Sequence, residues 1–374
     1  MRMRPTMRRL IWVSLLLSAL AYGGSTSGQT SGRMPALSAQ SWPEADLLFR
    51  NDPSWLGADD AYSIDLGNGR VLWLFADTFI ALRPGGTRHQ SKMIRNSVAI
   101  QRGYDPSSAS IKFYWRATHG KPASFFGEQR DVWYWPGDGI VVGGRLLIFL
   151  MKIHETKTGL GFEAFGWAAV AVDNPHDEPL RWRVRWLDAP ANGLNVIIGS
   201  ASLVRAGDFV YAFSAQEPVG KHDVYLVRWP VDRAAEGDLR EPFWWCGSDQ
   251  WVKQTQLKQE PAIVFSEAQT EFTVHFDSTL KRYIQIQTVG FGAASVASRS
   301  SSEITGSWSG LEPFYRPPES DRAGILVYAG KAHPELKGAD LILTYVANHS
   351  NFGALVDDRS IYYPRFLKAR FGAN

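Results

Sequence analysis

Short apolar runs separated by polar and glycine-rich turns recur along this chain, and one of these runs is repeated five times. The copies are Gly69–Asp77, Gly144–Lys152, Gly207–Ala215, Leu280–Thr288 and Gly338–Val346. Their length and their content of β-branched and aromatic residues predict strands. The copies are spaced by about 67 residues on average, which suits a four-stranded propeller blade with insertions.

Further apolar strands flank the repeated runs. One precedes each run, as at Gly139–Val142 and Ile325–Tyr328, and another often follows, as at Ser97–Ile100. No segment keeps a helical period for long, so we predict an all-β protein that forms a five-bladed β-propeller. A large sandwich or two β domains are the alternatives. The ring is expected to be closed either by a strand near residues 46–49 or by one within residues 360–367, which would pair into the opposite terminal blade. The sequence does not decide between them.

The N-terminal segment has the pattern of a secretory signal peptide over residues 1–21. Four arginines precede the apolar stretch Leu10–Ala21, which ends in the small residues that a signal peptidase needs. This stretch is too short for a transmembrane helix, which takes about 20 apolar residues. We expect a secreted or periplasmic protein with a disordered lead-in over residues 22–41 and a single propeller domain over residues 42–374.

Composition excludes several classes of function. Without the four leader arginines, the 40 basic residues become 36, against 37 acidic ones, so nothing electrostatic indicates a nucleic-acid partner. Cys246 is the only cysteine, which rules out an intrachain disulfide. We expect a monomer, with no transmembrane segment in the mature chain and no cofactor.

Residues 55–78 read as two apolar strands joined by a Gly-Asn-Gly turn at residues 67–69. Glycine and asparagine tolerate the positive φ angles of tight hairpins. The start of the first strand then lies beside the end of the second, so Asp59 or Asp60 and Asp77 are expected at one sheet edge. Two acids on a rigid scaffold are what glycosidic bond cleavage needs, and Asp59 and Asp77 are the first candidates. A strand-end aspartate bonded to local amides is the alternative for Asp77.

The first strands of the predicted blades place their ends around one central opening. Four of the five blades carry ionisable groups there, and beyond the first hairpin these are Asp138, Glu271, Lys331 and His333. Converging charges are costly unless they are paired or functional. We expect these residues, with Asp60, to bind sugar hydroxyls or to tune the pKa values of the catalytic pair. Asp138 also fits a simple Asx turn.

Three further residues, Asn96, Trp133 and Trp135, are candidates for sugar binding. Asn96 follows the first hairpin, where it would bond to a sugar hydroxyl or cap a strand. The chain has 15 tryptophans, and aromatic faces stack on sugar rings. Most of them lie in strand patterns and are expected in the core, whereas Trp133 and Trp135 lie near a predicted loop and share one strand face.

Other chemistries have little support in the sequence. The eight histidines show no ligand spacing, so no zinc site is expected, although carboxylates near the axis would suit a structural calcium ion. The phosphate-loop, dinucleotide and nucleophile-elbow motifs are incomplete or absent from the sequence.

Several motifs together resemble a bacterial family of glycosidase-like five-bladed propellers, long called a domain of unknown function, that includes endo-D-arabinanases. The motifs are Trp55–Ser63, Leu72–Thr78, Arg95–Ser97, Tyr134–Gly139, Thr270–Val274 and Ile361–Arg365. The resemblance implies that Asp59 and Asp77 are the catalytic carboxylates. Asp60 is a departure, because family members commonly carry glycine there.

These observations lead to one main expectation and two alternatives. The main one is an exported glycoside hydrolase that acts on a polysaccharide, with D-arabinan as one substrate and with Asp59 and Asp77 as acid and base, or acid and nucleophile. The first alternative is a non-catalytic glycan-binding propeller of the cell envelope. The second is a structural scaffold for an envelope partner.

Overall fold

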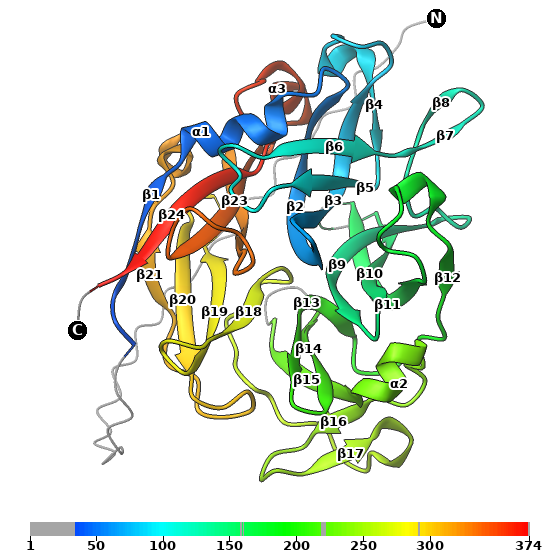
Figure 1. The fold of residues 1–374 in the computed structure, drawn as a ribbon, viewed down its shortest axis with the longest axis vertical. Coiled ribbons are helices and arrows are strands. Elements are labelled where there is room, and N and C mark those ends of the chain that lie inside the picture. The colour runs from blue at the N-terminus through cyan, green and yellow to red at the C-terminus, as the bar shows by residue number, and fades with distance from the viewer. Residues whose placement is uncertain (1–33, 158, 160, 218–221, 291, 373–374) are drawn as a thin grey trace, which may run out of the picture. The chain divides into compact units, whose positions relative to one another are not determined.

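The computed structural model describes residues 34–157, 159, 161–217, 222–290 and 292–372. The signal peptide predicted for residues 1–21 lies outside these residues. From Pro35 onward, five antiparallel sheets are arranged as blades in a ring, which confirms the five-bladed β-propeller (Figure 1). Within the described residues, no helix combines the length and apolar character needed to cross a membrane.

The first two blades contain the predicted hairpins. Blade one has the order β2-β3-β5-β6, with β4 paired to β3: β2 Trp55–Gly67, β3 Arg70–Ala81, β4 Ser91–Ile94, β5 Ser97–Arg102 and β6 Ser110–Tyr114. Blade two consists of β9 Val132–Val142, β10 Arg145–Glu155, β11 Phe162–Val172 and β12 Val184–Trp186. Between them lies the short hairpin of β7 Arg116–Thr118 and β8 Lys121–Ala123.

The other three blades follow the same antiparallel plan. Blade three consists of β13 Val196–Ala206, β14 Phe209–Gln216, β15 Val224–Pro230, β16 Phe243–Trp245 and β17 Trp251–Lys253. Blade four consists of β18 Thr273–Asp277, β19 Arg282–Val289, β20 Ser295–Ser301 and β21 Glu312–Tyr315. Blade five consists of β22 Ile325–Ala332, β23 Leu341–His349, β24 Arg365–Phe371 and β1 Leu37–Ser41. The five repeated runs thus correspond to the second strands β3, β10, β14, β19 and β23.

Helices are few and short among the described residues. The α-helices are α1 Pro43–Asp46, α2 Val231–Glu236 and α3 Phe352–Asp357. The 3₁₀ helices are η1 Leu47–Arg50, η2 Arg88–Gln90, η3 Pro179–Arg181, η4 Gln254–Gln256 and η5 Pro318–Asp321.

The ring is closed by β1, which is the outer strand of blade five. β1 pairs with β24 over five residues, with Leu37 opposite Phe371 and Ser41 opposite Leu367. Both closure segments considered from the sequence are therefore wrong as stated. Residues 46–49 are helical, and β24 pairs with β23 of its own blade. The disordered lead-in predicted for residues 22–41 is also wrong at Leu37–Ser41, although residues 22–33 lie outside the described part.

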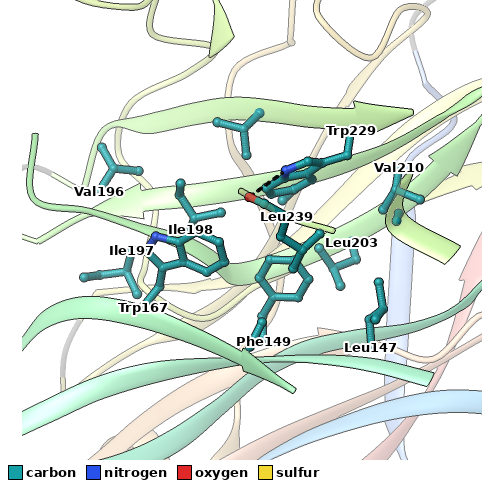
Figure 2. Packing of buried hydrophobic residues seen from close by; sticks show 14 of the residues in the cluster. Leu147, Phe149, Trp167, Val196, Ile197, Ile198, Leu203, Val210, Trp229 and Leu239 are labelled. Atoms are coloured by element: carbon teal, nitrogen blue, oxygen red, sulfur yellow. Dashed lines mark hydrogen bonds between the residues drawn. The ribbon is translucent and has the colours of Figure 1, made fainter. Parts of the chain in front are cut away.

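Large aromatic residues fill the space between neighbouring blades. Figure 2 shows the cluster between blades two and three, where Phe149 stacks on Trp167 with ring centroids 5.6 Å apart. Trp229 closes this cluster, and its indole Nε1 donates a hydrogen bond to the Leu239 carbonyl at 3.2 Å. Because the buried indole nitrogen has a partner, the aromatic packing carries no desolvation penalty there.

Two glycines allow close approaches near the inner strands. A Cβ at Gly137 would lie 2.3 Å from the Gly199 carbonyl oxygen, so only glycine lets blades two and three approach this closely. A Cβ at Gly57 would lie 2.2 Å from the Tyr362 carbonyl oxygen. Gly57 therefore allows the segment before β24 to pack against the start of β2, where the predicted catalytic residues begin.

Candidate active site

A distorted stretch of β2 separates the environments of Asp59 and Asp60. The β2–β3 register shifts twice around Asp60, and Asp60 and Ala61 have φ angles of 74° and 66°. Positive φ angles in residues other than glycine cost energy and persist only where the surrounding structure enforces them. As a result, Asp60 is fully buried, whereas Asp59 is partly accessible.

The carboxyl group of Asp59 is bound by a tyrosine. The Tyr328 hydroxyl donates a hydrogen bond to Asp59 Oδ2 at 2.6 Å, and Asn348 Nδ2 donates to the same hydroxyl at 2.9 Å. Within the described residues, Asp59 Oδ1 is buried and has no hydrogen-bond partner. Burial, followed by the charges of Asp77 and Glu271, raises the pKa of Asp59 to about 8. Asp59 is therefore mostly protonated at neutral pH.

The carboxyl group of Asp77 accepts hydrogen bonds from two side chains, one of which is cationic. Trp135 Nε1 donates to Asp77 Oδ1 at 3.0 Å, and Arg95 Nη1 donates to Asp77 Oδ2 at 3.2 Å. Burial raises the pKa of Asp77, while the charge of Arg95 and the bond from Trp135 oppose this rise. Both contacts favour the charged form, so Asp77 is better suited than Asp59 to act as a carboxylate.

The structure brings Asp59 and Asp77 together. The β2–β3 register places Ala58 opposite Thr78, so Asp59 directly follows and Asp77 directly precedes a paired position. After burial, the charge of Asp77 is the next cause of the raised pKa of Asp59. The Tyr362 hydroxyl donates to the Asp77 carbonyl at 3.0 Å, and the charge of Asp59 raises the pKa of this tyrosine. Tyr362 thus bonds to the main chain at Asp77.

Asp60, Glu271 and Lys331 form a buried charge network beside this pair. Lys331 is 0% exposed, and its Nζ lies 2.9 Å from Asp60 Oδ1 and 2.7 Å from Glu271 Oε2. The same nitrogen donates to the Asp60 carbonyl at 2.8 Å and lies 4.3 Å from the centre of the Tyr62 ring. Burial lowers the pKa of Lys331, but the charges of Asp60 and Glu271 raise it by more. The net effect is a raised pKa, so the lysine stays charged. Lys331 and Asp60 can influence the site electrostatically but are too deeply buried to bind a sugar.

Asp138 connects two blades. Its carboxyl oxygens accept hydrogen bonds from the amides of Gly139 and Leu203, both at 2.7 Å, and from the Ser202 hydroxyl at 3.3 Å. Burial raises its pKa to about 7, against the effect of these donors. The bond to Gly139 is the local turn contact considered from the sequence. The bonds to β13 go beyond it and give Asp138 a structural role between blades two and three.

His333 and Asn96 are wrong as predicted contacts for a substrate. Both are fully buried. His333 lies between the Ser63 hydroxyl at 2.5 Å and the Thr344 hydroxyl at 2.8 Å, and burial lowers its pKa to about 3. The Asn96 side chain bonds to three main-chain groups, namely the amide and carbonyl of Phe126 and the carbonyl of Tyr134. These side chains are occupied by the protein itself and cannot reach a ligand.

Three functional residues were missing from the predicted site, although two of them lie in segments that the sequence marked. Tyr328 ends an expected strand, and Tyr362 lies in one of the resemblance motifs, but a search for ionisable groups passes over phenols. Arg88 carried no signal at all. It is buried, and its guanidinium donates to four carbonyl oxygens, those of Leu56, Leu355, Asp358 and Ile361, at 2.6 to 2.9 Å. This arginine ties the segment before Tyr362 to the start of β2.

The described residues contain no cluster of three His, Cys, Asp or Glu side chains placed to hold a metal ion.

Comparison with known proteins places the chain among others of the same architecture. Residues 44–370 match the profile of a family described as a domain of unknown function, DUF5005. A "putative hydrolase" from Bacteroides ovatus ATCC 8483 has a similar structure, with a TM-score of 0.70, 15% identity, and coverage of 91% of this chain and 92% of that one. No curated protein sequence matches.

Two sugar-acting enzymes are more distant structural neighbours. The catalytic domain of a GH62 α-L-arabinofuranosidase from Coprinopsis cinerea has a TM-score of 0.49 and 13% identity, covering 89% of this chain and 96% of its own. An exo-1,5-α-L-arabinanase from a bovine ruminal metagenomic library has a TM-score of 0.45 and 10% identity, covering 85% and 94%. At such identities, structural similarity establishes the fold alone.

Proposed function

This chain belongs to the DUF5005 family, and we propose that it is an exported glycoside hydrolase that cleaves a polysaccharide. The family description assigns no activity, so the proposal depends on the site. The observation that supports it is the contrast between two neighbouring acids. Asp59 has a pKa raised to about 8, whereas Asp77 is paired with Arg95. Two carboxyl groups whose environments differ in this way are suited to opposite roles in glycoside hydrolysis.

In the proposed mechanism, Asp59 is the general acid and Asp77 is the carboxylate. Because its pKa is raised to about 8, Asp59 holds a proton at neutral pH. That proton passes to the departing glycosidic oxygen as its bond to the anomeric carbon breaks. Asp77 then either activates a water molecule or attacks the anomeric carbon itself. The configuration of the first sugar released, read by NMR, distinguishes these two courses.

Arabinan is the first polysaccharide to test. The reason is the resemblance of the Trp55–Ser63 and Leu72–Thr78 motifs to a family that includes endo-D-arabinanases. One fold serves many specificities, so a panel that contains arabinans and other plant and bacterial polysaccharides is needed.

The experiment compares reducing-end release by the wild type, Asp59→Asn and Asp77→Asn. The rate of each variant should be about 10²-fold to 10⁴-fold lower than that of the wild type, because this is the usual contribution of a general acid or base. Asp65→Asn is the matched control, because Asp65 is an exposed acid on the same strand, and this variant should keep wild-type activity. Full activity in Asp59→Asn or Asp77→Asn would contradict the role of that residue.

An aryl glycoside of the cleaved sugar separates the two roles. A phenolic leaving group that departs without protonation needs no acid catalyst, so Asp59→Asn should retain much of its activity on this substrate. Asp77→Asn should lose activity on both the aryl glycoside and the polysaccharide. The reverse pattern would exchange the assignments of acid and carboxylate.

A non-catalytic glycan-binding protein is the second candidate. The supporting observation is that Trp133 and Trp135 lie in contact on one strand, with ring centres 6.4 Å apart, and that Trp135 bonds to Asp77. This candidate predicts saturable polysaccharide binding, no release of reducing ends, and binding that survives Asp59→Asn.

Export belongs to the same proposal and has a separate test. Sequencing the N-terminus of protein recovered from the periplasm or the medium should show a chain that begins after Ala21. Recovery of the uncleaved chain from the cytoplasm alone would contradict export.

A further inference from the structure

A cavity of about 580 Å³ opens on blade two, near the start of β9 and the end of β10. It is lined by Glu128, Arg130, Asp131, Val132, Trp133, His154 and Glu155. Ligand-binding pockets commonly measure about 300 to 1,000 Å³, so this cavity has room for a small ligand. The residues come from the start of β9, the end of β10 and the loop before β9.

Trp133 connects this cavity to Asp77. The Arg95 guanidinium lies 4.3 Å from the centre of the Trp133 ring, and its Nη1 lies 3.2 Å from Asp77 Oδ2. A single guanidinium thus separates the Asp77 carboxylate from a ring that lines the cavity. Trp135 makes a second connection, because it contacts Trp133 and also donates to Asp77. A ligand that packs on Trp133 would therefore be linked to Asp77 through one guanidinium and one indole.

Two hydrogen bonds through Ser124 also connect the main chain at Arg95 to the cavity wall. The Ser124 hydroxyl accepts from the Arg95 amide at 3.0 Å and donates to Glu128 Oε1 at 2.9 Å. The charge of Glu128 also raises the pKa of Asp77. The cavity and the carboxylate pair are thus coupled through hydrogen bonds and through charge.

The charges on the cavity wall exclude one class of ligand. Three carboxylates, Glu128, Asp131 and Glu155, face a single guanidinium, that of Arg130. His154 does not offset them, because its Nε2 lies 2.8 Å from Glu163 Oε1 outside the lining. A sugar that carries a carboxylate would be repelled by this excess of negative charge, whereas a neutral sugar would find hydrogen-bond acceptors and an aromatic surface.

We propose that this cavity is a subsite for a neutral sugar residue of the substrate chain, bound on the Trp133 side of the carboxylate pair. This inference rests on the proposed function and specifies its substrate class, a neutral glycan of at least two residues. Binding energy from a sugar that does not react can be used to orient the one that does. The subsite therefore predicts that longer neutral oligosaccharides bind more tightly and react faster than short ones.

The experiment measures binding in the Asp59→Asn full chain, in which hydrolysis is suppressed. Isothermal titration uses neutral arabino- and xylo-oligosaccharides of increasing length and oligogalacturonides of the same lengths. The affinity for at least one neutral series should rise with length and should fall about tenfold or more when Trp133→Ala is added. Trp133→Phe should recover part of this loss. Trp186→Ala, which changes an exposed tryptophan outside the cavity, should have no effect.

A charge reversal keeps the test independent of folding defects. Adding Glu155→Lys, which changes an exposed side chain on the cavity wall, should increase the affinity for oligogalacturonides about tenfold. The inference is overturned if the neutral series bind equally well with and without Trp133, if oligogalacturonides are preferred by the unmodified cavity, or if no oligosaccharide binds.

These outcomes are distinct from the failure of the proposed function. Length-dependent binding through Trp133, combined with no hydrolysis by the wild type on any polysaccharide, would refute the hydrolase and retain the subsite. Hydrolysis that depends on Asp59 and Asp77 but is unchanged by Trp133→Ala would retain the hydrolase and refute the subsite.

Discussion

At the level of single residues, the protonated state of Asp59 has a consequence for stability. Its pKa is about 8 in the folded chain, compared with an ordinary value of 3.8. Between these values, the unfolded chain releases the proton before the folded chain does, so the contribution of Asp59 to stability is lost as the pH rises from about 4 to about 8. The site thus keeps an acid at the cost of stability at alkaline pH.

Asp59→Asn should therefore gain stability relative to the wild type as the pH rises. The difference in free energy of unfolding between variant and wild type should shift in favour of the variant by about 2 kcal/mol from pH 4 to pH 8, less than the whole pKa shift because Asp59 is partly accessible. Urea unfolding at the two pH values measures this shift, with Asp65→Asn as the control. A difference that does not change with pH would mean that Asp59 has an ordinary pKa.

Tyr328 affects the pKa of Asp59. Its hydrogen bond favours the charged form of Asp59, so Tyr328→Phe should raise the pKa of Asp59 further. The alkaline limb of the pH profile of kcat/KM should move to higher pH by about one unit. Tyr345→Phe is the control, because Tyr345 is another buried tyrosine bonded to an acid, Glu319 at 2.8 Å, in blade five. An alkaline limb that moves to lower pH, or not at all, would contradict this role.

The sequence was informative about acids and less so about their neighbours. Asp59 and Asp77 could be paired because hairpin geometry alone brings strand ends together. Asn96 and His333 were misjudged because a polar residue at a strand end looks the same in sequence whether it faces water or bonds to the backbone. Lys331 was expected near the axis, but its burial against two acids follows from packing between blades far apart in sequence.

At the level of elements, the contact between the start of β2 and the segment before β24 depends on Arg88. All four of its hydrogen bonds go to main-chain carbonyls, so the arginine joins two segments without an acidic partner. Arg88→Met should lower the free energy of unfolding by about 2 to 4 kcal/mol, because several buried carbonyls lose a charged donor. Arg88→Lys should restore only part of this loss, since an ammonium cannot reproduce the planar fork.

Denaturant unfolding of both variants measures this effect, with Arg83→Met at an exposed position as the control. The Arg88 variants should also lose activity beyond their loss of stability, because Tyr362 follows directly after this contact. An unfolding free energy for Arg88→Met within about 0.5 kcal/mol of the wild type, as for an ordinary surface change, would contradict the role of Arg88.

The elements themselves were predicted unevenly. The second strands of all five blades could be read from the apolar repeat, because buried central strands show the strongest pattern. The apolar pattern predicts a strand at residues 46–49, where the structure has helices. Pro43 and Glu44 just before this segment are a typical helix start. The distortion of β2 could not be predicted. Aspartate adopts a positive φ more readily than most residues, but alanine does not, and both lie within an apolar strand pattern.

At the level of the whole molecule, β1 is the element on which ring closure depends. A chain that begins at Trp42 leaves the outer edge of β24 unpaired. It should unfold several degrees below the full chain, because about 2 kcal/mol or more of strand pairing and burial is lost. A chain that begins at Met34 keeps β1 and is the control, with the melting temperature expected to match that of the full chain. Equal melting temperatures for the two truncated chains would show that β1 adds nothing to stability.

The pairing of Leu37 with Phe371 also determines when the molecule can be complete. A polypeptide still being synthesised, or one cut short by a premature stop before residue 365, has no partner for its first strand and an incomplete blade five. Such a fragment exposes unpaired strand edges, which are templates for aggregation. The first strand of the propeller therefore stays unpaired until synthesis has passed residue 371, so completion of the ring is one of the last events in the folding of this protein.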